Sequence, residues 1–97
     1  MINFLKEENI SDETISLLEK KKTSNELFDL SLNKVQILKI IKYLKSINIK
    51  NIEELLINET YIFYKVASDI KIELSKYEEV PLAEAINNNY EIIEQII

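Results

Sequence analysis

The chain contains no glycine, and its only proline is Pro81. Glycine supplies the positive-φ conformations of tight turns and helix C-caps, and two-residue β-hairpins depend on it. A chain without glycine must turn at asparagine, serine and aspartate instead. Short helices joined by polar corners meet this condition, whereas a sheet built from hairpins does not. The sequence therefore predicts an all-α fold.

The spacing of the apolar residues predicts six to eight short helices in a single domain that covers residues 1–97. The longest is a central helix at about 33–47, around which the others pack. Its expected inward stripe and the residues that widen it are Val35, Leu38, Ile41 and Leu44, together with Ile37, Ile40 and Ile47. So many apolar positions in one helix imply that it is covered on more than one side. Asn48 follows the helix and is expected to adopt the left-handed conformation that glycine usually supplies.

Polar residues predict where several helices begin. Ser11 precedes two acidic residues and is expected to cap the second helix. Asn51 and Glu54 have the spacing of a capping box, and Ser68 is expected to cap a helix over 69–77. The first backbone amides of a helix have no partner within the helix. At each of these starts we expect a nearby side chain of the same segment to accept a hydrogen bond from one of them.

One segment occurs twice in the chain. FLKEENI at 4–10 is similar to YLKSINI at 43–49, and a double leucine follows each copy, at 17–18 and at 55–56. This pattern indicates two stacked helical-repeat units, the simplest form of a solenoid. The alternative is chance similarity, because frequent isoleucine, asparagine and lysine are also typical of coding bias in an AT-rich genome.

Residues 38–63 read LKIIKYLKSINIKNIEELLINETYIF. This segment resembles one unit of the mitochondrial transcription termination factor (mTERF) repeats. The resemblance implies a helical solenoid and, because many members of that family bind nucleic acid, a nucleic-acid ligand. The sequence differs from the family pattern at Asn48, where glycine is usual, and at Glu59 and Thr60, where a proline is usual.

The chain has no histidine and no cysteine. It therefore lacks the usual general base near neutral pH, a thiol nucleophile, and the usual ligands of zinc and iron. Its glutamate pairs do not supply the converging oxygen atoms of a calcium loop. We predict no catalytic residue, no metal ligand and no cofactor, in a protein that is not an enzyme.

The C-terminal segment is the main candidate for a partner-binding surface. A helix over 90–97 would be apolar around more than half of its circumference, and it is too short to be stable alone in water. It must dock on the protein's own core or on a partner. We predict a non-enzymatic protein-interaction module, an adaptor, regulator or inhibitor, that binds another protein or a second copy of itself. The expected contact residues are Tyr90, Ile93 and Ile97, with Glu91 and Glu94 at the rim.

The charge distribution suggests an alternative function. All basic residues are lysines, and residues 77–97 contain five glutamates and no lysine, which equals the net charge of −5. Candidates for contacts with a nucleic-acid backbone are four lysines of the central helix, Lys34, Lys39, Lys42 and Lys45. The other interpretation is a solvated helix face whose field is balanced by the protein's own acidic C-terminal helices. The absence of arginine makes nucleic acid the less favoured partner.

Neither a membrane nor secretion is indicated by the sequence. No apolar stretch approaches the length that spans a bilayer, and the first residues, MINFLKEE, lack the basic and apolar regions of a secretion signal. We therefore expect a cytoplasmic protein that does not use a membrane as partner.

Overall fold

The computed structural model describes residues 1–97 and consists of helices and connecting turns, without a β-strand. The prediction of an all-α fold is confirmed. The α-helices and the 3₁₀ helices (η) follow in the order η1 (Asn3–Glu8), α1 (Asp12–Lys21), α2 (Ser24–Leu32), α3 (Lys34–Ser46), α4 (Ile52–Asn58), η2 (Thr60–Tyr64), α5 (Ala67–Leu74), α6 (Glu79–Asn88) and η3 (Tyr90–Gln95). None of them has the length and apolar character that a membrane-spanning segment needs.

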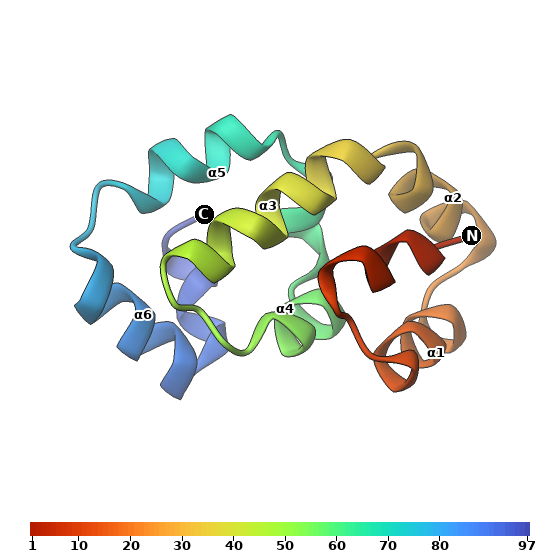
Figure 1. The fold of residues 1–97 in the computed structure, drawn as a ribbon, viewed down its shortest axis with the longest axis horizontal. Coiled ribbons are helices and arrows are strands. Elements are labelled where there is room, and N and C mark those ends of the chain that lie inside the picture. The colour runs from red at the N-terminus through yellow and green to blue at the C-terminus, as the bar shows by residue number, and fades with distance from the viewer.

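The helices follow one another as three triplets (Figure 1). The N-terminal triplet is η1, α1 and α2, the middle triplet is α3, α4 and η2, and the C-terminal triplet is α5, α6 and η3. Helix α3 runs through the middle of the molecule and contacts η1, α2, α4, η2 and α5. The helix predicted at about 33–47 is therefore the central one, as expected.

The buried face of α3 differs from the predicted stripe. Ile37, Ile40, Ile41 and Leu44 are buried, whereas Val35 is 61% exposed. An α-helix has about 3.6 residues per turn, so each three-residue step falls about 60° short of a full turn. Three such steps place Val35 on the side opposite Leu44. Only alternating steps of three and four residues remain on one face.

Two asparagines make the turns that glycine would otherwise make. Asn9 and Asn48 are the only residues with positive φ, at 62° and 67°, and the predicted left-handed Asn48 is confirmed. In each corner the amide of the following isoleucine donates to the carbonyl five residues back, over 3.3 Å after Asn9 and 3.0 Å after Asn48. The two copies of the repeated segment therefore end in the same hydrogen-bonded corner.

Helices α1 and α5 begin in different ways. The Ser11 hydroxyl caps α1 as predicted and accepts a hydrogen bond from the Thr14 amide over 3.2 Å. Ser68, in contrast, lies inside α5 and caps nothing. The amide of Ala67 at the start of α5 donates instead to Gln36 Oε1 of α3, over 2.8 Å. A side chain of the middle triplet thus takes the place of the predicted local cap.

The start of α4 also depends on a distant element. The predicted capping box at Asn51 and Glu54 is absent, because the Asn51 amide group donates to the carbonyl of Ile86 over 2.7 Å. Asn87 Oδ1 accepts a hydrogen bond from the Lys50 amide over 2.7 Å. Helix α6 therefore fixes how the chain enters α4.

Glu53 connects α4 to the start of α1. Its carboxylate accepts hydrogen bonds from the Ser11 amide over 3.0 Å, the Ser11 hydroxyl over 2.8 Å and the Thr14 hydroxyl over 2.7 Å. Burial raises the pKa of Glu53, but the hydrogen bonds from Thr14 and Ser11 together outweigh burial and hold this pKa below its ordinary value of 4.5.

Candidate partner-binding groove

The C-terminal helix η3 is a 3₁₀ helix, not the α-helix expected over 90–97. In a 3₁₀ helix the residues i and i+3 lie one above the other. Ile93 therefore shares an edge of η3 with Tyr90, and Glu94 shares a second edge with Glu91. Ile92 and Gln95 form the third edge. The α-helical spacing that placed Ile93 and Ile97 on one side does not apply here.

The predicted contact residues divide between the core and the surface. Ile93 is fully buried in the core, with Tyr90 and Ile97 packed against the core and partly buried. Glu91 and Glu94 are exposed. The helix thus docks on the protein's own core, and Ile93 is not accessible to a partner in this conformation.

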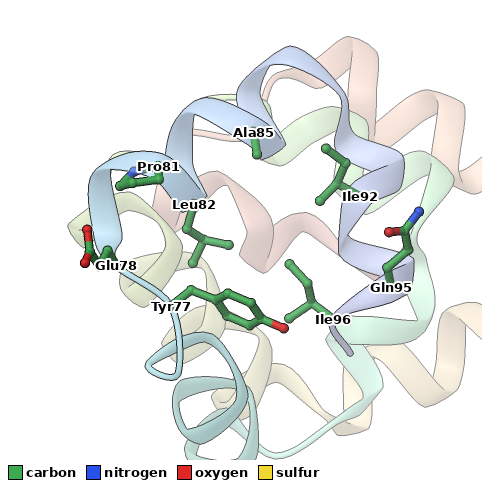
Figure 2. Close-up of a pocket in the computed structure, with 8 residues that line it drawn as sticks. All are labelled: Tyr77, Glu78, Pro81, Leu82, Ala85, Ile92, Gln95 and Ile96. Carbon is green, nitrogen blue, oxygen red and sulfur yellow. The ribbon is translucent and has the colours of Figure 1, made fainter.

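A mainly apolar groove with a volume of about 480 Å³ lies between α6 and η3 (Figure 2). The side chains of Leu82, Ile92 and Ile96 and the ring of Tyr77 point into it. We call this feature the α6–η3 groove. Its full lining is Tyr77, Glu78, Pro81, Leu82, Ala85, Ile92, Gln95 and Ile96.

Local sequence explains both walls of the α6–η3 groove. Pro81 lies in the first turn of α6, where its missing N–H costs no helical hydrogen bond. Leu82 on the next position is buried and forms the floor. The Asn89 side chain accepts a hydrogen bond from the Glu91 amide over 3.1 Å and starts η3 directly after α6. The two walls therefore belong to consecutive helices with a very short connection.

The surroundings of the α6–η3 groove are acidic. Residues 77–97 contain five glutamates and no lysine, and Glu78 stands at the groove margin. Glu59, which lies between α4 and η2, is only 5% exposed. Burial, followed by the charges of Glu94 and Glu91, raises the pKa of Glu59. This half of the molecule thus presents an apolar surface bordered by negative charge.

The lysines of α3 are partly neutralised by η1. Lys34 Nζ lies 3.4 Å from the Glu7 carboxylate, and Lys45 and Lys42 lie 3.4 Å and 3.8 Å from that of Glu8. The acids that balance this face thus belong to the N-terminal triplet. No ion pair joins these lysines to a glutamate of the C-terminal helices, so the balance of the field by those helices stays a prediction.

A lysine from α5 joins the same face. Lys39 and Lys42 line a shallow depression together with Tyr43, Ser46 and Lys71. The Lys71 ammonium lies 5.7 Å from the centre of the Tyr43 ring. No local pattern in the sequence indicates Lys71, because this residue reaches the face only through the packing of α5 against α3.

No group of three or more carboxylates is arranged to hold a metal ion. The chain matches no protein-family model, and no curated protein or solved structure is significantly similar to it. The resemblance of residues 38–63 to an mTERF repeat therefore stays a prediction.

Proposed function

We propose that the protein is a non-enzymatic protein-interaction module that binds an amphipathic, lysine- or arginine-bearing segment of another protein in the α6–η3 groove. The observation that carries this proposal is the apolar lining of the groove, where Tyr77 is 48% exposed above the buried floor residue Leu82. Solvent-exposed apolar surface that is bordered by polar residues is typical of protein-interaction sites. A groove of this kind suits the apolar face of a short helix.

The glutamates of residues 77–97 support the basic character of the partner. Complementary charges accelerate association and exclude partners of the same charge, while buried apolar contacts supply most of the affinity. We therefore expect partner binding whose association rate falls with salt, but whose complex persists once it has formed.

The proposal can be tested by affinity capture from a lysate of the source organism, with nuclease present. Replacing Ile92 by serine should weaken capture of the partner at least tenfold, because it removes an apolar wall of the groove. Leu32→Ser is the matched control, since Leu32 is 70% exposed on α2, outside the groove. Circular dichroism should show both variants folded. Undiminished capture by Ile92→Ser would contradict the proposal, and a concentration-dependent dimer in light scattering would identify a second copy as the partner.

A second candidate function is nucleic-acid binding, favoured by the convergence of Lys39, Lys42 and Lys71 on one depression. Lys34 and Lys45 contribute less, because Glu7 and Glu8 lie 3.4 Å from them, closer than the 3.8 Å between Glu8 and Lys42. Lysine offers phosphate a point charge without the paired hydrogen bonds of arginine, which suits contacts to the backbone that do not depend on base sequence.

This candidate predicts a specific salt dependence. Three phosphate contacts on duplex DNA give a slope of about −2.7 for the logarithm of the association constant against that of the salt concentration. Lys71→Ala should make the slope shallower by about 0.9, while Lys34→Ala should leave it nearly unchanged. Fluorescence anisotropy with a mixed-sequence duplex measures both. Binding that does not respond to salt, or no binding at low salt, would exclude this function.

A further inference from the structure

Three exposed apolar side chains stand at the corner between α2 and α3. Phe28 and Leu32, one turn apart on α2, are 53% and 70% exposed, and Val35, in the first turn of α3, is 61% exposed. Only Asn33 separates the two helices, so the three side chains form one short ridge. Single exposed apolar residues are common on protein surfaces, but neighbouring ones bordered by polar residues are typical of interaction sites. We call this feature the α2–α3 ridge.

The charges beside the α2–α3 ridge complement those of the α6–η3 groove. Lys39 is exposed one turn after Val35 and takes part in no ion pair. Asp29 follows Phe28 at the other end, so the α3 end of the ridge is the basic one. In the groove, Glu78 also lacks an ion pair, and no lysine occurs in residues 77–97. An apolar ridge with a free positive charge thus matches an apolar groove with free negative charges.

The ridge and the groove lie at opposite ends of the molecule. Figure 1 shows α2 at one end of the long axis and α6 at the other, and the molecule extends 37 Å along this axis against 24 Å and 23 Å across it. The ridge therefore cannot reach the groove of its own chain, whereas it can reach the groove of a second copy. A contact between two different surfaces of identical chains is heterologous and can repeat from one copy to the next.

We propose that the α2–α3 ridge of one copy docks in the α6–η3 groove of a second copy, so that the protein assembles head to tail. The apolar side chains of the ridge cover the floor residue Leu82 and the wall residue Ile92. Lys39 brings its charge to the acidic surroundings of the groove. This inference rests on the proposed function, because it uses the same groove, and it names the occupant of that groove when no other protein is present. A second copy and a partner segment then compete for one site.

The test is sedimentation velocity of the purified protein at increasing concentration. A ridge of three side chains makes a small contact, so we expect a weak association that grows with concentration. The average sedimentation coefficient of the wild type should keep rising, without the plateau that a closed dimer gives.

Two variants alter one surface each. Leu32→Ser changes only the ridge and Ile92→Ser changes only the groove, and each should weaken the association at least tenfold. Ile72→Ser is the matched control and should leave the association unchanged, because Ile72 is 59% exposed on α5 and belongs to neither surface. Circular dichroism should show all three variants folded.

Mixing the two weakened variants tests the head-to-tail arrangement directly. The groove of Leu32→Ser and the ridge of Ile92→Ser are both intact. An equimolar mixture should therefore form a dimer with the affinity of the wild-type contact, and this dimer should grow no further. In a dimer that uses the same surface on both copies, mixing would restore nothing.

Two results would overturn the head-to-tail assembly: a wild type that stays monomeric up to about 1 mM, or a mixture of the two variants that does not associate. Neither measurement involves another protein. The proposed function fails instead if Ile92→Ser captures its partner from the lysate undiminished. Leu32→Ser remains the control of that capture experiment, because its groove is unaltered.

Discussion

Replacing Ile93 by alanine will lower the free energy of unfolding by about 2–5 kcal/mol. Ile93 is fully buried, so its truncation removes apolar contacts and leaves a cavity beneath η3. Ile92→Ala, on the adjacent position, will cost clearly less, because the Ile92 side chain is partly exposed in the α6–η3 groove. Urea unfolding followed by circular dichroism measures both values under the same conditions.

The contrast between these two neighbours is the informative result. Equal losses for Ile92→Ala and Ile93→Ala would mean that η3 does not expose one edge to the groove and bury another. An unchanged unfolding midpoint for Ile93→Ala would mean that η3 is not part of the cooperative core. Either outcome would reopen the original prediction that Ile93 contacts a partner.

Replacing Glu53 by alanine will lower the free energy of unfolding by about 3 kcal/mol, since hydrogen bonds to a charged acceptor contribute about 1.5–3 kcal/mol. The change removes the acceptor of three hydrogen bonds from Ser11 and Thr14. The Thr14 residue is only 6% exposed, so its hydroxyl has poor access to water as a substitute. Glu54→Ala is the matched control, because Glu54 is exposed on the same helix and should change stability little.

Acidification provides a second measurement on Glu53. Its pKa lies below 4.5 in the folded protein, because hydrogen bonds from Thr14 and Ser11 outweigh burial. A lowered folded-state pKa gives stability that is present above the unfolded-state pKa and lost as the pH falls through the folded-state pKa. Wild-type protein should therefore lose stability below about pH 4.5, and Glu53→Ala should lose less. An identical pH dependence in the two proteins would rule out this role of Glu53.

Glu53 and Glu59 thus act in opposite directions on the same pH axis. Three donors stabilise the charged form of Glu53, whereas burial beside Glu94 and Glu91 disfavours the charged form of Glu59. The Glu53 contribution is lost at low pH and the Glu59 contribution at higher pH. Single variants separate them, since Glu53→Ala removes the first contribution and Glu59→Gln removes the second.

Features that depend on backbone chemistry could be predicted from the sequence. The absence of glycine predicted a helical fold, and it also predicted the left-handed corner at Asn48. The cap at Ser11 followed from residues that are neighbours in the chain. Each of these features is determined within a few residues, which is the range over which sequence rules apply.

Features that depend on packing could not be predicted in this way. Gln36 supplies the acceptor at the start of α5, and no spacing rule connects it with Ala67. Helix η3 is a 3₁₀ helix, and this geometry places Ile93 in the core and Ile92 in a wall of the α6–η3 groove. The sequence pattern of isoleucines was compatible with both helix types, and only docking on the core selects between them.

The exchange of helix-start hydrogen bonds between triplets determines the size of the folding unit. Glu53 of the middle triplet holds the start of α1, Gln36 holds that of α5, and Asn87 of the C-terminal triplet fixes the entry to α4. Many helical arrays can lose a repeat and keep the others folded, since each repeat contributes stability of its own. Here an excised triplet would leave donors at a helix start without partners. We therefore expect the protein to fold as one indivisible unit, and divided fragments to regain structure only when mixed.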